Sequence, residues 1–129
     1  MKPELRNKQF GFKRFLNSFK YSLSGLKYAY LHEQSMFIHG LSLILTIILG
    51  FILKINSIEW ILILSLLCLV AVIELINTAI EATVDLVTKE YHPLAKIAKD
   101  TASGAVFLIS IVTLLVGLSI FIPKLISLF

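Results

Sequence analysis

Hydrophobic residues along the chain follow two kinds of pattern. Between Phe12 and Tyr30 large apolar side chains recur at steps of three and four, which predicts a helix with one apolar face. Three later stretches are almost continuously apolar, and each is close to the ~20 residues that cross a hydrocarbon core. Their approximate bounds are 37–53, 58–82 and 102–122. The pattern therefore predicts an all-α integral membrane protein with an N-terminal amphipathic helix and three transmembrane helices.

The N-terminal segment, 1–33, is the expected surface helix. Its lysines and its arginine at position 14 fall mostly off the apolar stripe, near the head groups of a membrane on which the stripe would lie. A plain anchoring helix is compatible with the same pattern. The stripe consists of Phe12, Phe15, Leu16, Phe19, Leu23, Leu26 and Tyr30.

The amino-acid composition also indicates a membrane protein with a single domain. The chain has 129 residues, 57% of them hydrophobic, and a mean hydropathy of +0.89. That is too apolar for an ordinary soluble domain and too short for two domains, so we expect one membrane-embedded domain over 1–129. Cys68 has no second cysteine to pair with and is expected to be a small core residue.

Basic residues are distributed unevenly along the chain and predict the orientation. Seven precede the first span, one lies between the first and second, three follow the second, and one is near the C-terminus. The positive-inside rule then places the N-terminus and the connection after the second span in the cytoplasm. The residues are Lys2, Arg6, Lys8, Lys13, Arg14, Lys20 and Lys27, then Lys54, then Lys89, Lys96 and Lys99, and finally Lys124.

The second apolar stretch carries an unusual polar stripe. Glu74, Asn77 and Glu81 are spaced i, i+3 and i+7, so they share one helix face, which Asp85 extends. An acidic residue at the centre of a span costs about 2.5–3.5 kcal/mol on insertion scales, and such groups are tolerated where a metal, a proton or a polar partner compensates them. Polar packing between helices, or solvation of Glu81 and Asp85 at the end of the span, would also account for the stripe.

Further polar residues are expected at the same cytoplasmic level. Carboxylates suit Mg²⁺, a lysine such as Lys99 suits phosphate, and one carboxylate in a low-dielectric setting can accept a proton from an alcohol. This combination fits phosphoryl transfer, although the chain has no GxxxxGK[ST] loop and no kinase GxGxxG. The simpler alternatives are a local Lys99–Asp100 surface ion pair and a loop role for His92. The set comprises Glu33, Glu74, Asn77, Glu81, Asp85, Glu90, His92, Lys99 and Asp100.

Several segments together resemble a known family. The run Ile73–Asp85 contains E-x-x-N-x-x-x-E, and it is followed by Glu90–Asp100, ending in A-K-D, and by Ser103–Val106. This arrangement resembles the small bacterial integral-membrane lipid kinases, namely the prokaryotic diacylglycerol kinases and the related undecaprenol kinases. The likeness extends over about residues 12–118.

The resemblance implies a homotrimer with composite active sites between subunits, in the bacterial inner membrane, with the N-terminus and active site cytoplasmic. It implies transfer of the ATP γ-phosphate to a lipid hydroxyl with Mg²⁺, and no nucleic-acid partner. Glu74 matches the general base, Glu33 and Glu81 match metal ligands, and Ser22, Asn77 and Ser103 match substrate-side or supporting positions. The positions expected to contact ATP are Arg14, Tyr21, Glu33, Glu81, Glu90, Tyr91, His92, Lys99 and Asp100.

The chain departs from the family pattern in places. Met36 and Phe37 stand where the family often has an aromatic residue and an arginine, and Leu23 replaces a tryptophan common in the diacylglycerol branch. The segments 57–60, 92–96 and 120–125 are more similar to the Gram-positive branch, so undecaprenol is the expected substrate and diacylglycerol the alternative. The polar stripe alone also leaves open an ion carrier and a non-enzymatic membrane scaffold.

Overall fold

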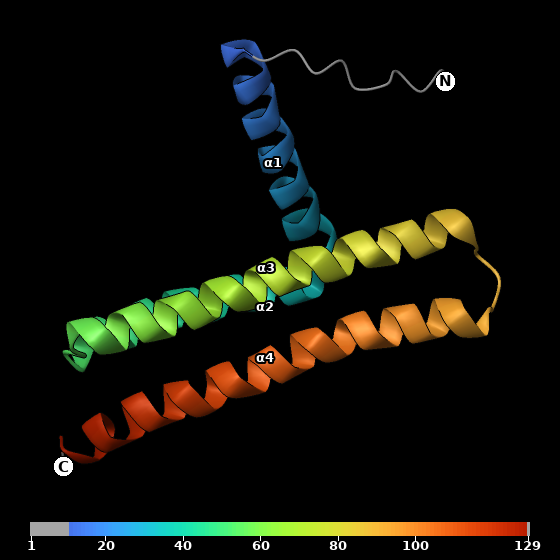
Figure 1. Cartoon of the computed structure of the whole chain (residues 1–129). Coiled ribbons are helices and arrows are strands. Elements are labelled where there is room, and N and C mark those ends of the chain that lie inside the picture. The colour runs from blue at the N-terminus through green and yellow to red at the C-terminus, as the bar shows by residue number, and fades with distance from the viewer. Residues whose placement is uncertain (1–10, 129) are drawn as a thin grey trace.

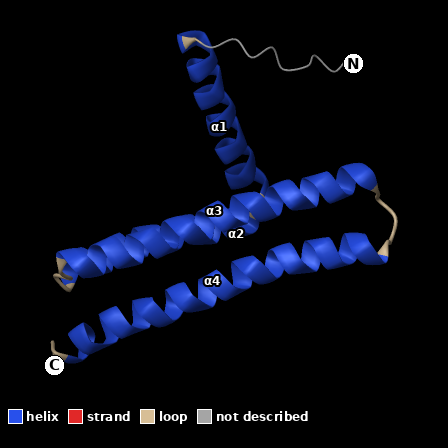
Figure 2. Cartoon of the chain, in the orientation of Figure 1, coloured by secondary structure: helices blue, strands red, loops and turns tan. Residues whose placement is uncertain are grey.

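The computed structural model describes residues 11–128, which form four helices joined by short connections (Figures 1 and 2). The predicted all-helical architecture is confirmed over this range. Residues 1–10, with three of the seven N-terminal basic residues, and residue 129 lie outside the described residues. The helices are α1 (Phe12–His32), α2 (Gln34–Ile52), α3 (Ser57–Val87) and α4 (Pro93–Ile126).

Polar residues at the helix junctions set where each helix begins. Glu33 adopts extended backbone angles, φ −105° and ψ 115°, and so separates α1 from α2 at the boundary that the sequence predicts. Asn56 caps α3 by accepting hydrogen bonds from the backbone N–H groups of Ile58 and Glu59, and the Glu59 side chain completes the capping box. His92 caps α4 through Nδ1, which accepts from Leu94 N at 3.2 Å.

Helices α2, α3 and α4 are each long and apolar enough to cross a membrane, as the three apolar stretches predict. Two of them extend beyond the predicted spans. The 31 residues of α3 and the 34 residues of α4 measure roughly 46 and 51 Å at 1.5 Å per residue, against ~30 Å of hydrocarbon. The apolar pattern marks where a membrane would end, whereas α4 begins earlier because its first turns contain good helix formers such as Ala95, Lys96 and Ala98.

The long helices pack side by side, and α1 extends away from them (Figure 1). Helices α3 and α4 run antiparallel, with Glu59 paired to Lys124 at 3.1 Å near one end and Asp85 paired to Lys99 near the other. Helix α2 packs against α3 and lies behind it in this view. The α3–α4 extensions therefore form an arm that projects past the start of α2.

Half of the buried apolar residues in the described part of the chain form one cluster at the end where α2 turns into α3. There the Trp60 ring covers Gly50 so closely that a Cβ on Gly50 would lie 2.5 Å from Cη2 of the indole. Glycine at position 50 therefore permits the close approach of α2 and α3. The buried cluster consists of Leu53, Ile55, Ile63 and Ile120, with Trp60, Leu67, Val116 and Phe121 packed against it.

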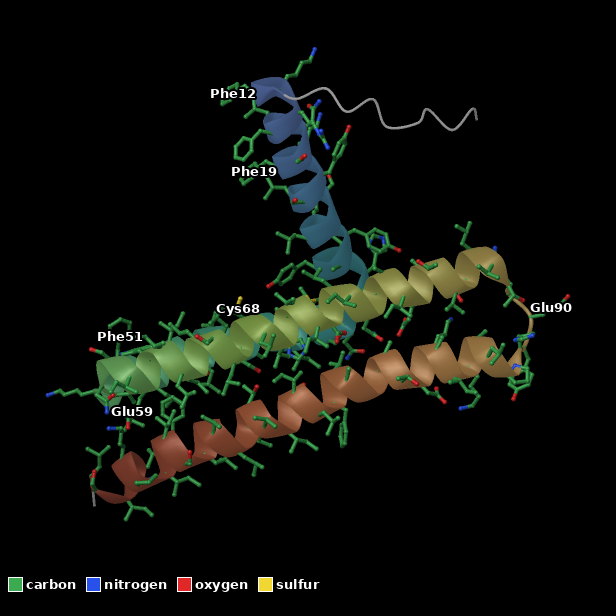
Figure 3. The ribbon with its side chains drawn as sticks, viewed as in Figure 1. Phe12, Phe19, Phe51, Glu59, Cys68 and Glu90 are labelled. Atoms are coloured by element: carbon green, nitrogen blue, oxygen red, sulfur yellow. The ribbon has the colours of Figure 1, made fainter. Side chains whose placement is uncertain are left out.

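Outside this cluster, much of the apolar surface of the helices is exposed. Cys68 is also exposed, and Figure 3 shows it on the outer side of α3, so the prediction of a core cysteine is wrong. The reason is that three spanning helices bury only the faces that they turn toward one another, which leaves the remaining faces to lipid or to other subunits.

Candidate functional site

The polar stripe on α3 becomes progressively more exposed along the helix. Glu74 retains 4% of its accessible surface and Asn77 retains 8%, while Glu81 is half-buried and Asp85 is exposed. Glu74 lies beside α2, and Glu81 and Asp85 lie on the projecting arm. A buried carboxylate on an apolar helix is thus joined by one continuous face to carboxylates in a more polar setting.

Glu74 is held by a residue that the sequence analysis missed. Ser35, in the first turn of α2, donates a hydrogen bond from Oγ to Glu74 Oε1. Thr78 Oγ1 donates to the backbone carbonyl of Glu74 at 3.1 Å, so this threonine is satisfied within its own helix. The sequence carried only a weak signal for Ser35, namely its position two residues after Glu33 at the start of an apolar span.

Asn77 connects Glu74 to the exposed end of the stripe. Its Nδ2 donates to Glu81 Oε1 at 3.0 Å, which orients the carboxylate that the sequence assigns to a metal. Among the described residues, two buried polar side-chain atoms have no hydrogen-bond partner: Asn77 Oδ1 and Nε2 of His39 on α2. An unsatisfied buried polar atom costs ~1–3 kcal/mol, so each of these two atoms has hydrogen-bonding capacity to offer to water or to a bound ligand.

The ion pairs of α4 differ from the local Lys99–Asp100 pair that the sequence also allowed. Lys99 Nζ lies 2.5 Å from Asp85 Oδ1 on α3, and Asp100 pairs with Lys96 one turn earlier on its own helix. A local Lys99–Asp100 pair is therefore not formed, because consecutive helical residues point in different directions. The Lys99–Asp85 ion pair links the two helices of the α3–α4 arm.

The α3–α4 connection holds three of the predicted nucleotide contacts. Glu90 and Tyr91 are exposed in this loop, and Figure 3 shows Glu90 at its tip. Thr88 Oγ1 accepts a hydrogen bond from Glu90 N at 3.1 Å, which shapes the turn. His92 is not a plain loop residue, because it supplies the N-cap of α4.

The predicted site residues on α1 lie apart from this arm. Arg14 and Tyr21 occupy the outer half of α1, which leads away from the α3–α4 loop (Figure 1). Ser22 is closer and lines an apolar cleft of about 520 Å³ between α1 and α3, with Gly25, Ala29, Leu75, Thr78 and Ala79. Ser103 is exposed on α4. A single chain thus brings Glu74, Asn77 and Glu81 together but not Arg14 and Tyr21.

The proposed metal ligands are also dispersed. Glu33 is half-buried at the α1–α2 junction, and Glu81 is half-buried on α3. Within residues 11–128, no group of three or more His, Cys, Asp or Glu side chains is close enough to hold a metal ion. The carboxylates present are nevertheless the ligand type that Mg²⁺ prefers, and this ion commonly completes its shell with phosphate oxygens and water.

Comparison with known proteins places this geometry in context. The family model described as prokaryotic diacylglycerol kinase matches residues 20–121, which include all of α2 and α3 and most of α1 and α4. The undecaprenol kinase of Bacillus subtilis is 41% identical over 112 residues, covering 87% of this chain and 91% of the relative. The diacylglycerol kinase of Escherichia coli K12 is 34% identical over 111 residues, covering 86% and 91%. That of Pseudomonas aeruginosa is 40% identical over 107 residues, covering 83% and 87%.

Proposed function

Because the chain belongs to the prokaryotic diacylglycerol kinase family, we propose that it transfers the γ-phosphate of ATP to the hydroxyl of undecaprenol at the cytoplasmic face of a bacterial membrane. That the chain is a membrane lipid kinase follows from its family and its three apolar helices. Undecaprenol is the proposed acceptor, supported by similarity to the Bacillus subtilis undecaprenol kinase and by the segments 57–60, 92–96 and 120–125. Diacylglycerol is the alternative, favoured by the names of other relatives.

The observation that carries the proposal is the buried carboxylate of Glu74, positioned by a hydroxyl on a neighbouring membrane helix. A carboxylate held within hydrogen-bond reach of an alcohol can accept its proton. We assign Glu74 the role of general base. As the lipid oxygen attacks the γ-phosphorus, the hydroxyl proton passes to Glu74, and the bond between the γ-phosphorus and the bridging oxygen breaks to release ADP.

Glu33 and Glu81 are the proposed ligands for Mg²⁺, which supplies neutralisation of the phosphate charge when bound. Glu81 is suited to this role because the Asn77 amide fixes one of its oxygens and leaves the other available. Glu33 is suited because it lies at the junction between the surface helix and the first span. The remaining ligands would be phosphate oxygens and water.

The nucleotide is proposed to lie along the α3–α4 arm. Lys99 provides a cation there, oriented by Asp85, and Asp100, Glu90, Tyr91 and His92 border the same end of the arm. Arg14 and Tyr21 would reach a nucleotide held by a neighbouring subunit, because α1 extends away from its own arm (Figure 1). This arrangement supports the proposed homotrimer with composite sites.

The remaining features concern the membrane. We propose that α1 lies on the inner leaflet, since its apolar stripe is uncovered by protein, as Phe12 and Phe19 illustrate in Figure 3. The N-terminus and the α3–α4 loop would then be cytoplasmic, in agreement with the distribution of basic residues. No nucleic acid is a proposed partner, because the basic residues serve the membrane surface and the nucleotide.

The deciding experiment supplies purified protein in bilayers with ATP and Mg²⁺ and with either undecaprenol or diacylglycerol. Faster phosphorylation of undecaprenol supports the proposal. Preference for diacylglycerol would keep the mechanism and replace the acceptor. Absence of phosphate transfer to both lipids, from folded protein, would refute both assignments.

A further inference from the structure

Ser35 makes the only side-chain hydrogen bond that joins α2 to α3 within the part of the chain that the structure describes. Its Oγ donates to Oε1 of Glu74, the group assigned as the base. Glu74 is buried, Ser35 is half-buried, and the two residues are 39 positions apart in the sequence. The contact therefore depends on the tertiary packing of α2 against α3, and it ends on the reacting carboxylate.

We propose that Ser35 is a positioning residue for phosphoryl transfer, holding Glu74 so that Oε2 faces the lipid hydroxyl. Among the described residues, Oε2 accepts no hydrogen bond, and it is not one of the two enclosed atoms that lack a partner. Oε1 is engaged and Oε2 is open, so the two oxygens have distinct roles. This inference rests on the proposed kinase function.

A glutamate on a membrane helix requires such an anchor. Its side chain has three rotatable bonds, and a base must stay within about 3 Å of the proton that it accepts, since a displacement of about 1 Å can cost 10²-fold in rate. Ser35 thus restricts the orientation of the carboxylate.

The position of Ser35 links the base to a second part of the site. Ser35 lies two residues after Glu33, the junction of α1 and α2 and a proposed metal ligand. The N-cap and the first turn of α2 therefore supply Glu33 and the anchor of Glu74 together. Anchoring both groups through one helical turn fixes the depth of the base relative to the metal and the phosphates.

The test compares two variants of nearly equal shape, Ser35→Thr and Ser35→Val. Threonine keeps the hydroxyl and valine replaces it with a methyl group. We expect Ser35→Val to lower kcat about tenfold, in line with the loss of one hydrogen bond to a charged group, while the KM values for ATP and lipid stay within about twofold. Ser35→Thr should retain kcat within about threefold.

Two further variants make the result decisive. Ser35→Ala removes the hydroxyl without added methyl groups and should reproduce the low kcat even if Ser35→Val assembles poorly. Ser42→Ala is the matched control, because the Ser42 hydroxyl on α2 bonds to the carbonyl of Ile38 at 2.9 Å and not to the site. It should behave as the wild type.

Equal kcat in Ser35→Val, Ser35→Ala and Ser35→Thr would overturn the assignment. A matching loss in all three, with raised KM and reduced thermal stability, would show a packing role and overturn it as well. These results leave the proposed function standing if the wild type phosphorylates lipid and Glu74→Gln does not. A wild type that phosphorylates neither lipid would overturn the proposed function and this inference together.

Discussion

Replacing Glu74 with glutamine tests the base assignment, because the amide has the same shape and its oxygen still accepts the hydrogen bond from Ser35, but it does not accept a proton. We expect kcat to fall by about 10²–10⁴, the usual contribution of general base catalysis, with little change in the KM for ATP. The measurement is phosphate transfer in bilayers, with size-exclusion chromatography to verify assembly. A normally assembled and active Glu74→Gln protein would contradict the assignment.

At the scale of single residues, helical spacing in the sequence predicts those site residues that lie on the same helix. The spacing of Glu74, Asn77 and Glu81 predicts a common face, and the structure aligns them, with Asn77 bonded to Glu81. Ser35 escaped notice because its partner is on another helix and a lone serine carries no periodic signal. The pairing of Lys99 with Asp85 was hidden for the same reason.

The α3–α4 arm is an element whose charged contact should affect nucleotide binding. Asp85 orients Lys99, which we assign to the nucleotide. Asp85→Asn removes the charge and leaves Lys99 free to sample other conformations, so we expect the KM for ATP to rise a few-fold and kcat to change less, because an exposed ion pair makes only a modest contribution. Steady-state kinetics with varied ATP measures this effect.

The control for the arm is Lys96→Gln, which breaks an ion pair confined to one helix, with Asp100. This variant should change the KM for ATP less than Asp85→Asn does. If Asp85→Asn leaves the KM for ATP unchanged, the contact serves only to join the two helices. High salt should narrow the difference between Asp85→Asn and the wild type, since exposed ion pairs are screened.

At the other end of the bundle, the close contact between α2 and α3 depends on Gly50, which has no Cβ. An added Cβ in Gly50→Ala would meet the Trp60 ring at 2.5 Å, which forces the helices apart, so we expect a loss of about 1–3 kcal/mol. Gly117→Ala is the matched control, because its Cβ would lie at an ordinary 3.6 Å from Ile63 Cδ1. Thermal unfolding in detergent should show a lower Tm for Gly50→Ala only. Equal Tm values would contradict the packing argument.

At the scale of elements, the apolar pattern predicts the number and order of helices better than their ends. The junction at Glu33 was predicted because the stripe and the first span meet there. The start of α4 at Pro93 was not predicted, because it lies well before the predicted span that begins at residue 102. A hydropathy pattern detects the membrane-spanning part of a helix and not the whole helix. The missed extensions form the arm that carries Asp85, Lys99 and Asp100.

At the scale of the whole molecule, the proposed site residues of one chain do not all lie together. Glu74 and Glu81 lie together on α3, whereas Arg14 and Tyr21 lie on the outer half of α1, which leads away from the arm (Figure 1). No sequence pattern predicts which surfaces of identical chains meet, because the exposed apolar faces of α2, α3 and α4 suit lipid and protein equally. The composite site therefore requires a test in the assembled protein.

Mixing two inactive subunits provides that test. One carries Glu74→Gln, and the other carries Arg14→Ala with Tyr21→Ala, so each lacks a different part of the proposed site. If α1 of one subunit serves the arm of its neighbour, random trimers from equal co-expression restore about a quarter of the wild-type sites, because each site needs one particular subunit of each kind. The measurement is lipid phosphorylation by purified mixed protein, compared with each variant alone. Activity no higher than the mean of the separate variants would mean that α1 serves the site of its own chain, since a site within one chain cannot be repaired by a neighbour.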